Sequence, residues 1–184
     1  VEGEVRVGAP ALGFLALLLG GHLVHNQLDN VRNYVFAARN FYGVLKVREY
    51  AETEDTTANR TLIHGSINHG MQLTDPQFRR EPTSYYTPTS GFGRALRILQ
   101  RKKSVRVGVT GLGAGVTAAF CRPGDYFRFY ELNPLALQVA KSQFTFYGDC
   151  PADKDVYLGD GRLVMERQAG QQFDLIAMDA FSSD

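Results

Sequence analysis

A short run of alternating valines, followed directly by three closely spaced glycines, constrains the fold of this chain more than any other segment. Residues 105–110 read VRVGVT, and their β-branched side chains favour a short, buried strand of a parallel sheet. Residues 111–115 then read GLGAG, and residues 116–121 can continue as a helix. Because glycine has no side chain, such a turn lets the backbone approach a ligand closely. The segment therefore predicts a ligand-binding turn at the end of a buried strand.

The spacing of the glycines narrows the class of ligand. Gly111, Gly113 and Gly115 form the pattern G-x-G-x-G. A dinucleotide-binding fingerprint needs its third glycine at position 116, which is Val116. The shorter pattern is typical of proteins that bind S-adenosylmethionine or its relatives. Taken alone, the cluster also fits a plain tight turn.

Strands and helices are expected to alternate around the glycine turn. A helix over residues 91–101 leads into the first strand. The pattern then predicts strands over 126–130, 156–158 and 173–178, and helices over 134–144 and 163–168. This alternation predicts an α/β fold with a Rossmann-like parallel sheet of the S-adenosylmethionine type and right-handed crossovers. Four strands are few for such a sheet, so we expect it to be incomplete at the C-terminus, with an exposed edge at its last strand.

A small antiparallel β domain is expected before the parallel sheet. Residues 43–50 (GVLKVREY) alternate apolar and charged side chains, as in a half-exposed strand. Residues 61–64 and 66–73 flank Gly65, which predicts a hairpin. Residues 75–88 contain three prolines and therefore form a connector instead of a helix.

The sequence is expected to form three parts. Residues 1–40 are an apolar N-terminal extension, residues 41–85 are the small β domain, and residues 86–184 are a partial Rossmann-like, nucleoside-binding domain. The chain opens with Val1 instead of Met and stops just after an apparent strand, so we expect a piece of a longer protein.

The most apolar segment is residues 9–24, which read APALGFLALLLGGHLV. Its length falls short of the roughly 20 residues that a membrane-spanning helix needs, and it lacks the basic flank of a signal peptide. Three alternatives stay open: a buried or strand-forming segment, the remnant of a membrane span, or an interaction surface. Residues 29–40 are expected to be irregular or helical.

Charge and cysteine content exclude several classes of partner. The formal net charge is +1 and no long basic run occurs, so we expect no nucleic-acid partner. The chain has 2 cysteines, which fit neither a disulfide framework nor a zinc site. We therefore expect separate structural thiols in a reducing compartment, and no metal.

Carboxylates follow the later strands at the positions where ligands of such sheets bind. Glu131 lies 20 positions after Gly111, the spacing expected for a carboxylate that accepts hydrogen bonds from ribose hydroxyls. Asp160, followed by Gly161, is placed to accept a hydrogen bond from an adenine amino group. The alternatives are a solvated strand-end acid for Glu131 and a simple Asp-Gly turn for Asp160.

Asp179 follows the last expected strand, where its side chain can take part in the reaction itself. A carboxylate there can hold a substrate amine and take its proton, which an amine must lose before its nitrogen can attack. The alternative is a helix cap or a hydrogen bond within the next loop.

In their order and spacing, these motifs resemble the spermidine synthase (polyamine aminopropyltransferase) family, and most closely its bacterial members fused to membrane domains. The resemblance covers residues 41–184. It rests on HGSINHGMQL, PTSYYTPTSGFG, GLGAG, ELN, GDG and MDAFSSD.

The resemblance implies a β domain over a Rossmann-like domain, usually in a homodimer. The implied reaction is attack of a polyamine nitrogen on the aminopropyl group of decarboxylated S-adenosylmethionine, which releases methylthioadenosine. By motif, Gln72 matches a glutamine lining the cofactor pocket, and Tyr85 or Tyr86 matches a tyrosine that orients the amine. The implied catalytic residues are Asp179 and Tyr86. The implied cofactor-binding residues are Gln72, Gly111, Gly113, Gly115, Glu131, Asp160 and Gly161.

The glycine turn departs from the family at Ala114, where the family carries an aspartate that holds the aminopropyl ammonium. An uncharged residue does not favour a cation, so two alternatives stay open. One is a methyltransferase that uses intact S-adenosylmethionine, and the other is a noncatalytic nucleoside-binding or regulatory module. We expect a cytoplasmic domain, with tethering to a membrane domain of the parent protein as an open alternative.

Overall fold

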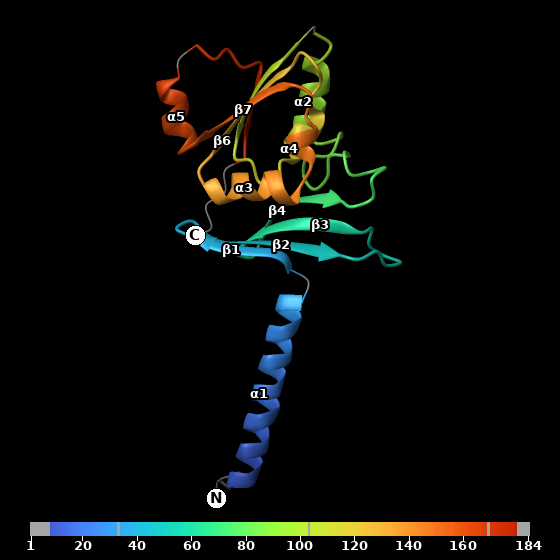
Figure 1. Ribbon diagram of the computed structural model, residues 1–184, viewed down its shortest axis with the longest axis vertical. Coiled ribbons are helices and arrows are strands. Elements are labelled where there is room, and N and C mark those ends of the chain that lie inside the picture. Colours follow the sequence, from blue (N-terminus) through green and yellow to red (C-terminus); the bar gives the residue numbers. More distant parts are fainter. Residues whose placement is uncertain (1–7, 33, 103, 169, 180–184) are drawn as a thin grey trace, which may run out of the picture. The chain divides into compact units, whose positions relative to one another are not determined.

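The computed structural model describes residues 8–32, 34–102, 104–168 and 170–179. The chain divides into two compact units, residues 1–34 and residues 35–184, and each unit is described by itself. The described part of the first unit is a long helix, and the second unit contains two four-stranded sheets (Figure 1).

Helix α1 (Ala9–Arg32) corrects the expectation for the N-terminal apolar segment. The strand-forming alternative is wrong, because the backbone is helical. The helix also continues past Val24, so that Pro10–Leu28 is long and apolar enough to cross a membrane. A signal sequence meets the same criteria of length and composition.

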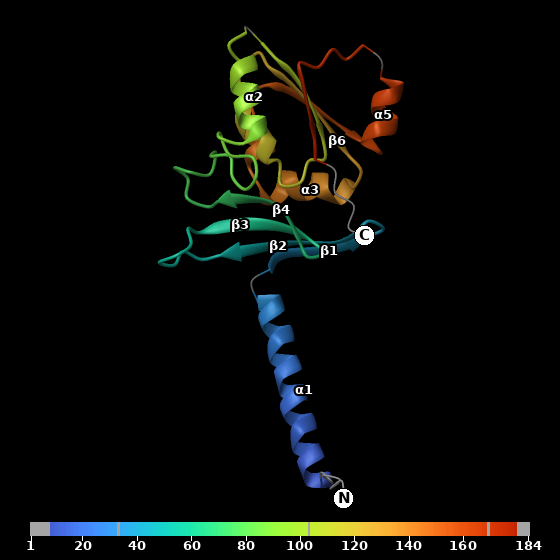
Figure 2. The same cartoon turned by 180° about the vertical axis from the view of Figure 1, so that it is seen from behind.

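An antiparallel sheet in the order β1-β2-β3-β4 opens the second unit (Figure 2). Its strands are β1 (Tyr34–Asn40), β2 (Gly43–Tyr50), β3 (Asn59–His64) and β4 (Ile67–Leu73). The predicted strand over 43–50 is confirmed. The predicted hairpin around Gly65 is confirmed as well, since β3 and β4 are antiparallel and place His64 opposite Ile67.

Strand β1 shows that the expectation of irregular or helical structure over residues 29–40 is wrong for most of that range. Burial alternates along the strand, with Tyr34 and Phe36 on the half-buried face. Val35 and Ala37 on the opposite, exposed face are apolar as well. The sequence therefore shows no alternation of apolar and polar residues, although the backbone is extended.

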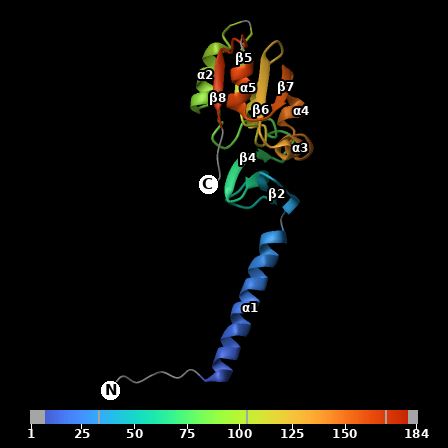
Figure 3. The ribbon, with the colours of Figure 1, turned by 90° about the vertical axis from the view of Figure 1, so that its left-hand side faces the viewer.

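The second sheet is parallel and has the strand order β7-β6-β5-β8 (Figure 3). Its strands are β5 (Arg106–Thr110), β6 (Tyr126–Glu131), β7 (Asp153–Leu158) and β8 (Leu175–Met178). The predicted fold class, a Rossmann-like parallel sheet preceded by an antiparallel sheet, is confirmed. Among the described residues β8 pairs with β5 alone, so its other edge is open, and Met178 is 86% exposed.

Helices cover both faces of the parallel sheet, with α5 on one face and α2 on the other (Figure 1). The helices are α2 (Gly91–Leu99), α3 (Pro134–Gln143), α4 (Phe146–Asp149) and α5 (Gly161–Arg167). Helix α3 begins as its sequence predicts, since the Asn133 side chain accepts a hydrogen bond from the backbone N–H of Leu135 and Pro134 occupies the first turn. The one-turn helix α4 has no counterpart in the sequence-based prediction.

The segment after the glycine turn is a five-residue 3₁₀-helix, η1 (Val116–Phe120), and not the expected α-helix. Gly115 at its start has φ 84°, and Cys121 at its end is extended. Both ends thus leave the helical region, which stops the segment before a second turn can form.

One hydrophobic core joins the two sheets of the second unit. It contains Leu45 and Val47 from β2 together with Val107 and Val109 from β5, each of which is 2% exposed or less. Helix α2 contributes Leu96, which is fully buried. Because the core is continuous, the antiparallel sheet is held against the end of the parallel sheet where the glycine turn lies.

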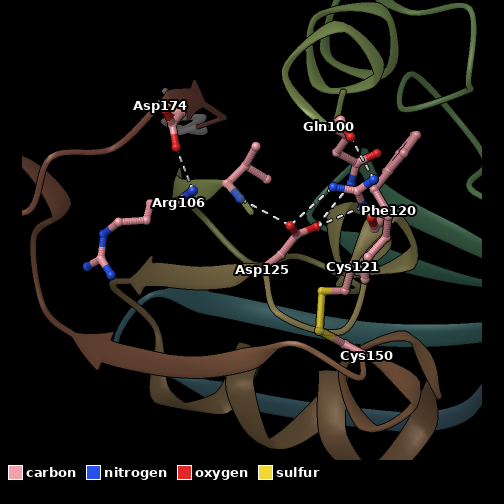
Figure 4. A network of polar contacts seen from close by, with 9 residues as sticks. Gln100, Arg106, Phe120, Cys121, Asp125, Cys150 and Asp174 are labelled. Atoms are coloured by element: carbon pink, nitrogen blue, oxygen red, sulfur yellow. Dashed lines mark hydrogen bonds and ion pairs between the residues drawn. A yellow bond between two sulfur atoms is a disulfide. The ribbon is translucent and has the colours of Figure 1, made fainter. Parts of the chain in front are cut away.

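Cys121 and Cys150 form a disulfide, which corrects the expectation of separate structural thiols (Figure 4). The bond links the end of η1 to the end of α4, two segments that pack together although the cysteines are 29 positions apart in sequence. The prediction failed because sequence separation says nothing about which segments meet in the fold. The argument for a reducing compartment therefore loses its basis.

Candidate active site

A cavity of about 700 Å³ lies at the carboxyl ends of the parallel strands, between them and the antiparallel sheet. This volume lies within the range of small-molecule sites. The structure brings together six of the site residues predicted from the sequence, and Tyr85 lines the cavity with them. These six are Gly111, Gly113, Glu131, Asp160, Gly161 and Asp179.

Two glycines of the turn are required by close approaches within the protein. Gly111 has φ 89°, and a side chain there would collide with the backbone carbonyl of Asp179. Gly113 has φ 54°, and a Cβ atom there would lie 2.5 Å from the carbonyl oxygen of His69. Gly115 also has a positive φ, but it lies against α4 and does not line the cavity.

Glu131 ends strand β6 and is 8% exposed, so it is not a solvated strand-end acid. Its Oε2 accepts a hydrogen bond of 2.9 Å from the backbone N–H of Leu112, and its Oε1 accepts one of 2.8 Å from the N–H of Asn133. Burial raises the pKa of Glu131, and these backbone N–H groups act against that rise. The carboxylate thus ties the glycine turn to β6 while facing the cavity.

Asp160 starts helix α5 and lines the cavity, and its contact with an adenine amino group stays a prediction. Its Oδ1 accepts a hydrogen bond of 3.0 Å from the backbone N–H of Leu163, so it caps α5, and it also lines the cavity. Gly161 allows α5 to start close to the sheet, because a Cβ atom there would lie 3.3 Å from side-chain atoms of Thr110 and Tyr130.

Asp179 immediately follows β8, and its backbone is hydrogen-bonded to the central strand β5. Its backbone N–H lies 3.0 Å from the carbonyl oxygen of Thr110 and 3.1 Å from the Thr110 hydroxyl. Its Oδ2 accepts a hydrogen bond of 3.2 Å from the Tyr85 hydroxyl. Burial, and then the charge of Asp179, raises the pKa of Tyr85, so the hydroxyl stays protonated as the donor in this pair.

Tyr86 lies behind this pair. It is 9% exposed and belongs to the hydrophobic core, with its ring 4.8 Å from that of Tyr85 and 5.3 Å from that of Phe92. Burial, followed by the charge of Asp179, raises the pKa of Tyr86. Tyr86 and Asp179 line a small hollow next to the main cavity, so of the two tyrosines it is Tyr85 that faces the cavity itself.

The structure places Gln72 outside the cavity. Its amide donates to the carbonyl oxygen of Arg79 and to the Thr145 hydroxyl, and its Oε1 accepts from the backbone N–H of Thr145. The side chain is 5% exposed and does not line the cavity. Gln72 instead connects β4 to the residues that precede α4.

Several cavity residues were not singled out by the sequence. His64 and His69 project from β3 and β4, and Arg162 projects from α5. The repeated His-Gly pairs of HGSINHG were a usable signal, but their meeting with the glycine turn depends on how the two sheets pack. Among the described residues, no group of three or more His, Cys, Asp or Glu side chains is arranged to hold a metal ion.

Comparison with known proteins bears on the fold. No protein-family profile and no curated protein sequence matches the chain. Among solved structures, the chain is similar to a probable spermidine synthase from Corynebacterium glutamicum, with a TM-score of 0.61 and 19% sequence identity over 81% of this chain. The shared fold is spermidine synthase-like. The chain spans 53% of that protein, or about half of its length.

Proposed function

We propose that this chain is an aminopropyltransferase of the spermidine synthase type. In the proposed reaction, a polyamine nitrogen attacks the aminopropyl group of decarboxylated S-adenosylmethionine and methylthioadenosine leaves. The observation that carries this proposal is that Glu131 and Asp179 line one cavity from strands on opposite sides of β5. A nucleoside held by Glu131 across the glycine turn would therefore direct its sulfonium group toward Asp179.

The charge of the cavity supports a cationic substrate. Among the described residues, its lining includes three carboxylic acids, Glu131, Asp160 and Asp179, against one guanidinium, that of Arg162. An excess of carboxylates favours cations in a cleft that excludes much of the solvent. Decarboxylated S-adenosylmethionine and a protonated polyamine carry positive charges only, whereas intact S-adenosylmethionine also carries a carboxylate, which an acidic cavity disfavours.

In this proposal each residue has a distinct role. Glu131 accepts hydrogen bonds from the ribose hydroxyls, and Asp160 accepts one from the adenine amino group. Asp179, oriented by the Tyr85 hydroxyl, holds the ammonium of the acceptor next to the carbon under attack. The glycines at 111 and 113 line the cavity, so in this proposal the backbone of the turn itself borders the nucleoside.

A methyltransferase that uses intact S-adenosylmethionine is the second candidate, and Ala114 favours it. Ala114 is fully buried and lines neither hollow. Gly70 packs against it, since a Cβ atom on Gly70 would lie only 2.7 Å from the Ala114 Cβ. The counter-charge that an aminopropyl ammonium requires must then come from other residues of the cavity.

Calorimetric titration and product analysis separate the candidates. We expect methylthioadenosine and decarboxylated S-adenosylmethionine to bind more tightly than intact S-adenosylmethionine, and mass spectrometry to find an aminopropyl group on a diamine or triamine. Tighter binding of intact S-adenosylmethionine, with S-adenosylhomocysteine as product, would favour the methyltransferase. Absence of nucleoside binding would contradict both and favour the noncatalytic module.

A matched pair of variants tests the nucleoside site. Glu131→Gln should weaken methylthioadenosine binding by about tenfold or more, since a hydrogen bond to a charged group contributes about 1.5–3 kcal/mol. Glu54→Gln, which removes the same charge at an exposed position, should leave the affinity unchanged. Equal affinities of the two variants would remove Glu131 from the site.

A homodimer and tethering of the chain to a membrane by α1 remain further proposals. Light scattering of the purified chain tests the first, with a mass twice that of the 20.4 kDa chain as the expected result. Flotation with lipid vesicles tests the second, with a variant that lacks residues 1–32 as the control.

A further inference from the structure

The His69 imidazole occupies a position in the cavity that the proposed roles leave unused. In the part of the chain that the structure describes, four residues line both the cavity and the small hollow beside it, namely His69, Tyr85, Gly111 and Asp179. These residues come from β4, the connector, the glycine turn and the end of β8. His69 thus lies between the cavity and the hollow together with Asp179, the carboxylate that is proposed to hold the acceptor amine.

We propose that His69 is the catalytic base that accepts the proton of the attacking nitrogen, while Asp179 holds that nitrogen in place. This inference rests on the proposed function. From its position in the sequence, Asp179 is expected to perform both tasks, holding the amine and taking its proton. In this inference Asp179 holds the amine and His69 takes the proton.

The backbone fixes His69 relative to the reacting groups. Its carbonyl oxygen accepts a hydrogen bond of 3.0 Å from the N–H of Ala114, and Gly113 packs against the same oxygen. The following residue, Gly70, packs against the side chain of Ala114. A strand of the antiparallel sheet therefore holds the backbone of His69 against the glycine turn, at the border of the cavity, which helps to position a catalytic group.

His64 sets the electrostatic environment of the base from the neighbouring strand. Its Nε2 lies 2.7 Å from the carbonyl oxygen of Tyr42. Because a carbonyl oxygen only accepts, His64 Nε2 must carry a proton and donate. The His64 and His69 ring centroids are 5.6 Å apart, so protonation of His69 would place a cation next to the His64 ring.

The resulting environment keeps His69 in its basic form. Burial, and then His64, lowers the pKa of His69, whereas Asp179 acts in the opposite direction. Tyr85 faces the same space and stays neutral, and the other charged groups that line the cavity are Glu131, Asp160 and Arg162. At neutral pH the imidazole is therefore available to accept a proton, as a general base must be.

The proposed step conserves protons and electrons. The ammonium of the acceptor, held by Asp179, gives one proton to His69 and becomes a neutral amine. The nitrogen lone pair forms a bond to the aminopropyl carbon, and the electrons of the broken carbon–sulfur bond neutralise the sulfonium, which leaves as methylthioadenosine. The product nitrogen is again cationic, and the imidazolium releases its proton to solvent.

The test measures kcat, the KM for the acceptor and the pH profile of the wild-type chain, His69→Gln and His25→Gln. We expect kcat of His69→Gln to fall by about 10²-fold or more at pH 7 with KM changed less than about threefold. The acidic limb of the wild-type profile should disappear in this variant. His25→Gln, which alters an exposed residue of α1, should match the wild type in every respect.

Nuclear magnetic resonance of the imidazoles supplies a readout without turnover. His69 should titrate below the ordinary histidine pKa of 6.5, and Asp179→Asn should lower its pKa further, because the opposing carboxylate is removed. Binding of methylthioadenosine to His69→Gln with wild-type affinity shows that this variant is folded.

The outcomes separate the two proposals. If the wild type transfers aminopropyl groups but His69→Gln keeps its rate and pH profile, His69 is not the base and the proposed function stands. If His69 titrates at or above the ordinary histidine pKa of 6.5, the inference also fails. If the wild type transfers no aminopropyl group to any amine, the proposed function fails and the inference fails with it.

Discussion

The backbone carbonyl of His69, on the antiparallel sheet, accepts a hydrogen bond of 3.0 Å from the backbone N–H of Ala114, in the glycine turn of the parallel sheet. The two residues are far apart in sequence, and their sheets belong to one unit with a continuous core. This contact closes one wall of the cavity and fixes the turn against a strand. The glycine turn is thus shaped by the protein itself before any ligand binds.

Substitution at Gly113 tests this contact. Gly113→Ala should destabilise the chain by about 2–5 kcal/mol, because it adds a left-handed alanine and forces the His69 carbonyl away. Urea unfolding followed by circular dichroism measures the loss. Methylthioadenosine binding should weaken in the same variant, since the turn can no longer rest against β4.

Gly65→Ala is the matched control for Gly113→Ala. Gly65 has φ 60°, close to the 54° of Gly113, but no atom lies within 4 Å of the position that its Cβ would take. Gly65→Ala should therefore lower the free energy of unfolding only by the cost of the left-handed conformation, about 1–2 kcal/mol. Equal losses in the two variants would show that backbone strain, and not the contact with His69, explains the glycine at 113.

The pair of Asp179 and Tyr85 leads to a prediction about turnover. Asp179→Asn should abolish transfer but leave methylthioadenosine affinity nearly intact, because the role proposed for this residue is to hold the acceptor amine. Tyr85→Phe removes the hydroxyl 3.2 Å from Asp179 Oδ2 and should lower kcat by about tenfold, the effect of losing one hydrogen bond to a charged group. Steady-state kinetics checks both, and unchanged turnover of Asp179→Asn would remove it from the proposed role.

The disulfide predicts a response of stability to reductant. The crosslink between Cys121 and Cys150 closes a loop of about 30 residues, so its removal should cost about 3–4 kcal/mol of unfolding free energy. Urea unfolding of the wild type with and without dithiothreitol measures this cost. The double variant Cys121→Ser, Cys150→Ser should match the reduced wild type and should not respond to reductant. Equal stability of the oxidised and reduced wild type would contradict the crosslink.

Asp125 is expected to stabilise the fold without a role in the cavity (Figure 4). Its side chain is fully buried and accepts hydrogen bonds from the backbone N–H of Val105 at 3.1 Å and from the amide of Gln100 at 3.2 Å, and it pairs with Arg122 at 3.3 Å. Asp125→Ala leaves these donors unpaired and should cost about 3–5 kcal/mol. Denaturant unfolding measures the free energy of unfolding of the variant, and a decrease under 1 kcal/mol would contradict this role.

Asp174 predicts how stability changes at acidic pH. The backbone N–H of Arg106 and then the Lys102 ammonium hold the pKa of Asp174 below its usual range. A lowered folded-state pKa means that its contribution is present above pH 3.8, the ordinary value, and is lost as pH falls through the folded-state pKa. Asp174→Asn should therefore lose less stability on acidification than the wild type does. Parallel acid-unfolding curves of the two proteins would contradict this expectation.

Local sequence signals were sufficient for most elements of the second unit. The valines of β5, the alternation in β2 and the proline after Asn133 each act through neighbouring residues, so the strands and helix starts follow from the sequence. Strand β1 was not predicted, because Val35 and Ala37 are apolar on its exposed face and hide the alternation of apolar and polar residues. The helix expected after the glycine turn is a short 3₁₀-helix, since its ends are set by a left-handed glycine and a crosslinked cysteine.

The sequence by itself determined the α/β class, the glycine turn and the carboxylates that end the strands, because strand ends and turns are local features that spacing reveals. The tertiary structure alone decided that Cys121 meets Cys150, that Tyr85 faces Asp179, and that Gln72 lies outside the cavity. It also brought His69 to the glycine turn. These relationships depend on how one sheet packs against the other, and packing between distant segments leaves no periodic pattern in the chain.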